Sequence, residues 1–241
     1  MRLAICFFGQ PRYLGNTLVY ERYRQVMDQY NADVYVHSWI TGTASKMETS
    51  DWAKKHSFME NENSATIILS KYNPKKFRFD PPFSESLNEH DRAVVRNMRM
   101  YTENNERNLL SHLKSYSEAI KLVEDPETYD FILMTRFDAC LMDFPDLHDL
   151  DSSKFYLTKA YDGGWCDLIQ LCGGSYHKAF DVYDNFSSIS NTLSTKDPTM
   201  IAELYKRENY DLYFDRKDVR YIERLSSCLV RSENGLSNIQ C

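Results

Sequence analysis

The stretch Tyr129–Asp138, YDFILMTRFD, decides the fold, because a short apolar run leads directly into two charged side chains. Phe131–Met134 is the kind of run that fills a strand covered on both faces of a sheet. Arg136 and Asp138 follow two residues apart, so on an extended backbone their side chains point the same way past the strand end. In open α/β sheets, ligands bind outside the carboxyl ends of the strands. The stretch therefore predicts a buried strand and a binding site beside it.

The N-terminus repeats this arrangement. Leu3–Phe8 is a second apolar run, and it ends in the turn Gly9-Gln10-Pro11-Arg12. Arginine suits bidentate phosphate binding, so two such strand ends indicate a nucleotide-sized anionic ligand. The alternative is that Gly9 and Pro11 only end the strand and Arg12 pairs with a surface carboxylate. No GxGxxG or GxxxxGK[ST] pattern occurs, which excludes a dinucleotide fingerprint and a P-loop.

Further candidate ligand contacts lie at the same predicted edge. The strand expected over Asp33–His37 is followed by Ser38 and Trp39, so His37 would hydrogen-bond a ligand oxygen and Trp39 would stack on a base or sugar. A purely structural His37 is the alternative. Asp138 would bind a divalent cation that bridges two phosphates, since hard cations prefer oxygen ligands. The alternative there is a buried pair with Arg136 that orients the loop.

The order of elements predicts an α/β fold, with one domain built on a central, mostly parallel twisted sheet flanked by helices. The expected strands are Leu3–Phe8, Asp33–His37, Lys75–Phe79 at an edge, Phe131–Met134, Lys154–Thr158 and Asp167–Leu171. The expected helices are Asn16 to Tyr30, Ser64–Tyr72, Asp91–Glu124, one opening at Cys172-Gly173-Gly174-Ser175 and running to about Phe186, and one from Pro198 to about Asn209. Residues 220–231 suit either a strand or a helix.

Glycines gather in the second half of the chain. Four of the eight lie between residues 160 and 175, around Asp162, Trp165 and Asp167. Paired glycines beside an aromatic and a carboxylate suggest a loop that wraps an acceptor, with Asp167 as a candidate base. Two tight turns around a hairpin are the alternative.

Bulk properties exclude several classes of protein. The 241 residues carry a net charge of −6 and the pI is about 5.6, which argues against a nucleic-acid binder. No run of 18 apolar residues predicts a transmembrane segment. Six cysteines without CxxC spacing read as reduced thiols, so we expect a cytoplasmic protein. The 17 tyrosines and 13 phenylalanines should mostly be core.

The motifs FFGQPR, VHSW and YDFILMTRFD together resemble small GT-A-type glycosyltransferases, in particular sugar transferases of bacterial polysaccharide clusters and large algal viruses. The resemblance covers most of residues 1–190. It implies a hexosyl- or pentosyltransferase that moves a sugar from a nucleotide-sugar donor to a glycan or glycoconjugate acceptor. One domain, 1–241, would bind the donor with about 1–140 and the acceptor with about 141–241.

The strand ends, the glycine-rich region and the resemblance together give a set of expected site residues. The donor side would comprise Gly9, Gln10, Pro11, Arg12, His37, Trp39, Arg136 and Asp138; the acceptor side Trp165, Gly173 and Gly174; and the catalytic carboxylate Asp167, with Asp162 as second choice. Asp138 would hold Mn²⁺ or Mg²⁺. Arg136 stands where the family's DxD motif has its first Asp, so a guanidinium taking over part of the cation's role is the alternative.

The sequence is also compatible with other functions. The same strand ends would also serve a non-catalytic nucleotide- or glycan-binding protein, or a sugar nucleotidyltransferase. A nucleotidyltransferase usually carries a Gly-rich, basic N-terminal loop, and this chain has none.

Overall fold

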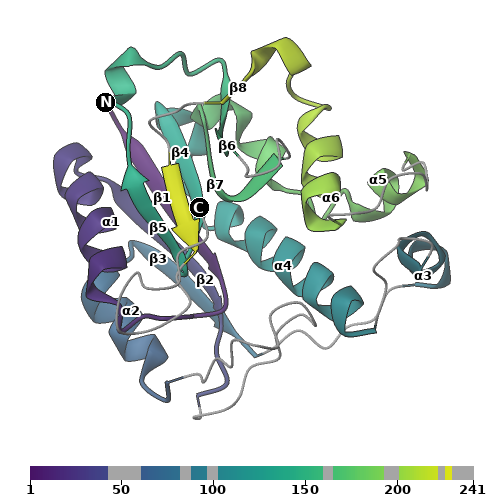
Figure 1. Ribbon diagram of the computed structural model, residues 1–241, viewed down its shortest axis with the longest axis horizontal. Coiled ribbons are helices and arrows are strands. Elements are labelled where there is room, and N and C mark those ends of the chain that lie inside the picture. Colours follow the sequence, from purple (N-terminus) through teal and green to yellow (C-terminus); the bar gives the residue numbers. More distant parts are fainter. Residues whose placement is uncertain are drawn as a thin grey trace.

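A seven-stranded sheet with helices on both faces forms the centre of the computed structural model (Figure 1). The structure describes residues 1–42, 61–81, 88–96, 103–159, 165–192, 201–221 and 226–229. The strand order is β3-β2-β1-β4-β7-β6-β8. The strands are β1 (Leu3–Gly9), β2 (Asp33–Trp39), β3 (Lys76–Asp80), β4 (Phe131–Arg136), β6 (Phe155–Lys159), β7 (Trp165–Cys172) and β8 (Val219–Tyr221). Strands β3, β2, β1 and β4 are parallel, while β7 runs antiparallel to both β4 and β6, so the expected mostly parallel sheet is confirmed.

Strand β1 lies at the middle of the parallel part, and its two phenylalanines show how the sheet is covered. Phe7 contacts the rings of Tyr23 and Tyr72, which lie on α1 (Thr17–Tyr30) and α2 (Ser64–Tyr72). Phe8 contacts the ring of Tyr116 on α4 (Glu103–Lys121). Successive strand residues point to opposite faces, so α1 and α2 cover one face and α4 the other.

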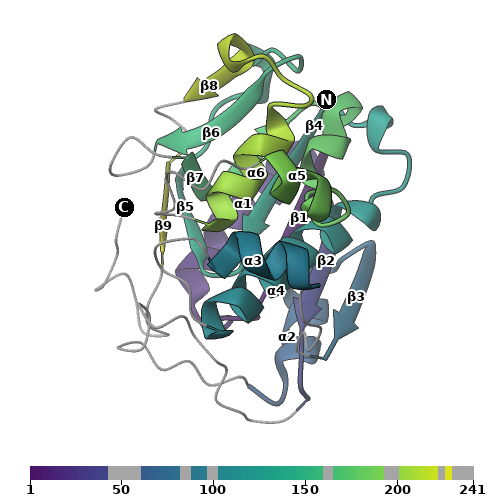
Figure 2. The ribbon, with the colours of Figure 1, turned by 90° about the vertical axis from the view of Figure 1, so that its right-hand side faces the viewer.

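Helices α3 (Glu89–Arg96), α5 (Phe186–Thr192) and α6 (Ile201–Tyr210) gather on the α4 side of the sheet (Figure 2). The single helix predicted over Asp91–Glu124 is wrong, because the structure has α3 and α4 there. Their packing differs: α3 contacts α5, whereas α4 lies on β1 and β2. The sequence of a helix does not show which other elements it packs against, so the pattern alone did not separate α3 from α4. No helix in the described part of the chain is long and apolar enough to cross a membrane.

The C-terminal part departs furthest from the sequence prediction. The helix expected to run to about Phe186 is wrong: a 3₁₀ helix, Gly174–Phe180, is followed by turns before α5 begins. Tyr176 has a non-helical backbone inside that segment, with φ −106° and ψ 15°. The ambiguous region after residue 219 contains β8 and β9 (Ser226–Leu229). Strand β9 pairs antiparallel with β5 (Ala139–Asp143) in a separate two-stranded sheet.

Many tyrosines are core residues, as expected, and their hydroxyl groups are hydrogen-bonded inside the protein. Tyr23 pairs with the hydroxyl of Thr135 at 2.5 Å, and Tyr116 bonds both Gln170 and Tyr210. A buried hydroxyl without a partner is costly, so these bonds allow the tyrosine rings to be fully buried.

Candidate functional site

The ends of β1 and β4 place two arginines and one aspartate together. The parallel register pairs Phe8 with Arg136, so the turns that follow the two strands leave the sheet at the same edge. Arg12 lies in the first turn and Asp138 in the second. Residues far apart in sequence thus meet at one strand-end edge.

The Asp138 carboxylate is the centre of this group. Its Oδ1 accepts a hydrogen bond from Arg136 Nε at 2.8 Å, and its Oδ2 accepts from Arg136 Nη2 at 2.7 Å. Arg12 Nη1 lies 3.5 Å from the same Oδ2. The Asp138 side chain is 2% exposed, against 17% for Arg12 and 19% for Arg136. The two arginine side chains are therefore the more exposed members of a group whose carboxylate is buried.

The turn after β1 is held by its backbone. Gly9 has φ +96°, a conformation that residues with a side chain rarely adopt. Its N–H donates to Ser115 Oγ at 2.7 Å, and its carbonyl accepts from Ser38 Oγ at 2.8 Å. Gln10 Oε1 accepts from Arg12 Nε at 2.7 Å, and Pro11 between them is buried. These contacts fix the position of the turn that carries the Arg12 side chain.

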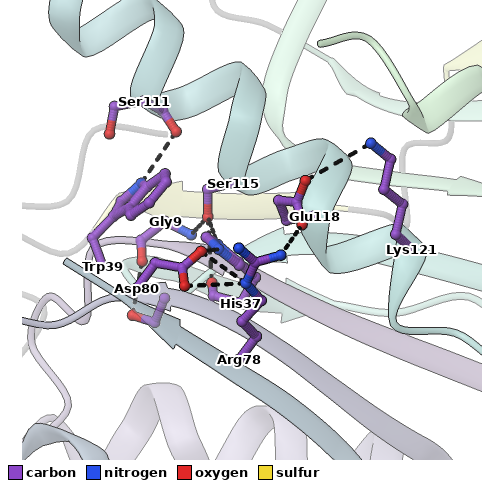
Figure 3. A network of polar contacts seen from close by, with 10 residues as sticks. Gly9, His37, Trp39, Arg78, Asp80, Ser111, Ser115, Glu118 and Lys121 are labelled. Carbon is purple, nitrogen blue, oxygen red and sulfur yellow. Dashed lines mark hydrogen bonds and ion pairs between the residues drawn. The ribbon is translucent and has the colours of Figure 1, made fainter. Parts of the chain in front are cut away.

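His37 and Trp39 lie at the end of β2 and face α4 (Figure 3). His37 is fully buried, with Nδ1 2.7 Å from Ser115 Oγ and Nε2 3.2 Å from Asp80 Oδ2. A proton on Nε2 satisfies both contacts, because Nε2–H donates to the carboxylate and Nδ1 accepts from the serine hydroxyl. The buried Trp39 indole N–H donates to the Ser111 carbonyl at 3.1 Å. Both side chains thus join the strand end to the helix.

This polar network continues to β3. Arg78 bonds Asp80 and also donates to Glu118 Oε2 at 2.6 Å (Figure 3). Burial lowers the pKa of His37, and the opposing effect of Asp80 does not restore it. Burial raises the pKa of Asp80, but hydrogen bonds from Arg78 and His37 outweigh it and lower that pKa below its usual value. A neutral histidine beside an ionised carboxylate follows.

Two residues near the site were missed from the sequence. Lys206 on α6 is 1% exposed, with Nζ 4.2 Å from the Tyr116 ring centre and 5.2 Å from that of Phe8. His112 on α4 contacts Phe8 edge-on at 5.3 Å. Burial lowers the pKa of His112 well below its usual range, and the positive charges of Lys206, Arg136 and Arg12 lower it further. The helical spacing of Leu109, His112 and Tyr116 predicts that His112 lies on the buried face of its helix. The residues around Lys206 do not predict its burial.

The residues predicted for the acceptor side lie at two opposite edges of the sheet. Trp165 and Asp167 lie at the start of β7, which runs antiparallel to β4 and therefore begins near the edge where β4 ends. Asp162 lies outside the described residues. Gly173 and Gly174 follow the other end of β7, at the opposite edge of the sheet from Asp138. There they allow close chain packing: a Cβ on Gly174 would lie 2.0 Å from the Pro126 carbonyl oxygen.

The arrangement at Asp138 does not fit a divalent cation. Both carboxylate oxygens accept hydrogen bonds from arginine, and two guanidinium charges lie beside them. Such a cation needs several oxygen ligands and is repelled by neighbouring positive charge. Across the described residues, no group of three or more His, Cys, Asp or Glu side chains is placed to hold a metal ion.

Comparison with solved structures supports the fold assignment. No protein-family model matches the chain, and no curated protein does. Core-mannan synthase A of Aspergillus fumigatus, in its Mn/GDP form, is 8% identical and superposes with a TM-score of 0.54 over 94% of this chain and 73% of its own. An active-site mutant of the galactosyltransferase LgtC is 11% identical, with a TM-score of 0.49 over 92% and 72% of the two chains. The seven-stranded sheet therefore belongs to the GT-A glycosyltransferase fold.

Proposed function

We propose that this protein is a glycosyltransferase that moves a sugar from a nucleoside-diphosphate sugar to a hydroxyl group of a glycan acceptor. The observation that carries the proposal is the partly exposed guanidinium pair of Arg12 and Arg136 over the buried Asp138, at the carboxyl ends of two parallel strands. This is where open α/β sheets bind ligands, and paired guanidinium groups suit a diphosphate. The fold shared with core-mannan synthase A supports it.

In the proposed reaction, an acceptor oxygen forms a bond to the anomeric carbon while the bond from that carbon to the diphosphate oxygen breaks. The electron pair leaves with the diphosphate, and Arg12 and Arg136 stabilise the charge that develops on it. If the enzyme inverts the anomeric centre, the acceptor hydroxyl proton passes to the carboxylate of Asp167, with Asp162 as second choice. Asp167 is favoured because β7 begins near the same edge of the sheet.

We assign donor binding to about residues 1–140 and acceptor binding to about 141–241, with a hexose or pentose as the transferred sugar. His37, Trp39 and Gly9 would support the donor side by fixing the ends of β2 and β1 against α4. Trp165 would contact the acceptor beside Asp167. Gly173 and Gly174 are left out of the proposed site, since they follow the other end of β7.

A panel of nucleoside-diphosphate sugars tests the proposal. We expect at least one donor to raise the melting temperature and to release free nucleoside diphosphate, slowly with water and faster with a glycan acceptor. Release of pyrophosphate from a nucleoside triphosphate and a sugar phosphate would instead identify a nucleotidyltransferase. Binding without any turnover would identify a binding protein.

A further inference from the structure

We infer that this site binds the donor diphosphate through arginine side chains, without a bridging divalent cation. The inference rests on the proposed function and specifies how the same site holds its substrate. It starts from the state of Asp138, the carboxylate that the sequence offers as a metal ligand.

Asp138 is engaged on both oxygens. Arg136 forms a two-pronged pair with it at 2.8 and 2.7 Å, and Arg12 approaches Oδ2 at 3.5 Å. A cation that approached these oxygens would compete with the hydrogen bonds from Arg136 and would be repelled by two guanidinium groups close by. The enclosed position of the carboxylate, 2% exposed, makes that exchange unfavourable.

The sign of the local charge favours an anion directly. Arg12, Arg136 and Asp138 together carry a net charge of +1, whereas two carboxylates at the strand end would carry −2 and need a cation before they could meet a diphosphate. A ligand arriving at this edge contacts the arginine side chains before Asp138, because they are the more exposed members. A guanidinium has five N–H donors in one plane, so it can join a carboxylate on one edge and a phosphate on another.

One neighbour, Lys206, adds to the positive field from the α4 side of the sheet. Lys206 lies over the rings of Tyr116 and Phe8, and Phe8 is the register partner of Arg136. After burial, the charges of Lys206, Arg136 and Arg12 are the main causes that lower the pKa of His112, and the opposing effect of Asp138 is smaller than those of Lys206 and Arg136. The charged side chains that act on His112 near the end of β1 are thus mostly positive.

The test is calorimetric titration of the full chain with UDP and GDP, once in excess EDTA and once with Mn²⁺. We expect at least one of the two to bind with the same affinity, within about threefold, in both buffers. Arg136→Asp should weaken binding in EDTA by about 10- to 100-fold, since it removes a charge-assisted donor, and Mn²⁺ should restore it because two carboxylates then flank Phe137. Arg136→Lys should bind more weakly than wild type but equally with and without Mn²⁺.

Arg24→Ala is the matched control, because Arg24 is an exposed arginine on α1 whose removal should leave binding unchanged in both buffers. Circular dichroism checks that each variant folds; should Arg136→Asp fail to fold, wild type and Arg136→Lys still decide the matter. Wild-type binding that requires Mn²⁺ would overturn this inference and leave the proposed function standing. Absence of UDP and GDP binding in both buffers, together with no response to the donor panel, would overturn both.

Discussion

At the scale of single residues, Asp138 and the two histidines of the α4 face carry the clearest consequences. A buried carboxylate is stable only when its charge is compensated, and here Arg136 and Arg12 provide the compensation. His37 and His112 are in the reverse situation, because each is buried in a setting that favours its neutral form. The first arrangement bears on ligand binding and the second on stability.

Asp138→Asn is expected to abolish detectable transfer and to lower the free energy of unfolding by about 1.5–3 kcal/mol, because an amide places an N–H₂ group against guanidinium donors. Donor turnover and urea denaturation measure the two effects. Asp28→Asn, at an exposed carboxylate on α1, is the control and should change neither. Near-normal turnover of Asp138→Asn, with and without chelator, would remove Asp138 from the donor site.

Asp167→Asn should lower the rate of transfer by about 10²–10⁴-fold if the enzyme inverts, since the amide keeps the shape but cannot accept the acceptor proton. Donor affinity should stay the same, because Asp167 is not assigned to the phosphates. Steady-state kinetics with donor titrations separate the two effects. If Asp162→Asn loses turnover and Asp167→Asn does not, Asp162 is the base.

Acidification should destabilise the protein through His37 and His112. Their folded pKa values lie below the unfolded value of about 6.5, so the unfolded chain binds more protons as the pH falls past that value. The stabilising contribution is therefore complete above pH ~6.5 and is lost below it. Melting temperatures from pH 8 to 5 measure this, and His112→Gln should flatten the profile.

At the scale of elements, the turn between β1 and α1 links helix stability to the site. Asn16 caps α1 by accepting the Val19 N–H at 3.2 Å, and this side chain is 3% exposed. The cap residue therefore lies only four residues after Arg12, so the same short segment sets the position of the cap and the position of the guanidinium.

Asn16→Ala should lower the free energy of unfolding by about 1 kcal/mol, because the helix loses a side-chain acceptor for its first turn. Asn16→Asp should retain most of the stability, since aspartate also caps. Chemical denaturation measures both variants. Equal stability of Asn16→Ala and wild type would show that water replaces the cap without cost.

The sequence predicts best those elements whose formation depends on residues close together in the chain. The apolar run predicts a strand as far as Met134, and β4 continues to Arg136 because Thr135 and Arg136 pair with Phe7 and Phe8 of β1. Strand β5 was not predicted at all, since its partner β9 is remote in sequence. Lys206 was missed for the same reason: its burial depends on α6 packing against α4, which no local pattern shows.

At the scale of the whole molecule, one sheet joins the proposed donor and acceptor halves. Strand β4 pairs with β7 from Ile132 to Thr135. On the α4 face, the Tyr116 hydroxyl bonds both Gln170 of β7 and Tyr210 of α6. The two halves therefore share a buried hydrogen-bond network and a continuous core.

We therefore expect residues 1–241 to unfold in one cooperative transition. Thermal melts followed by far-ultraviolet circular dichroism and by tryptophan fluorescence should give the same midpoint. Tyr116→Phe should shift that midpoint without splitting the transition, because it removes hydrogen bonds and keeps the ring. Two separated transitions would show that the halves are independent domains.

The pairing of β5 with β9 has a consequence for the order in which the site is completed during synthesis. Strand β5 begins directly after Asp138, so the turn that carries this carboxylate is held on one side by β4 and on the other by a strand whose partner is translated much later. A ribosome-bound chain that has β4 but not yet residues 226–229 has nothing to pair with β5. Since chains fold from the N-terminus as they emerge, the proposed nucleotide binding should be one of the last properties that the nascent protein acquires.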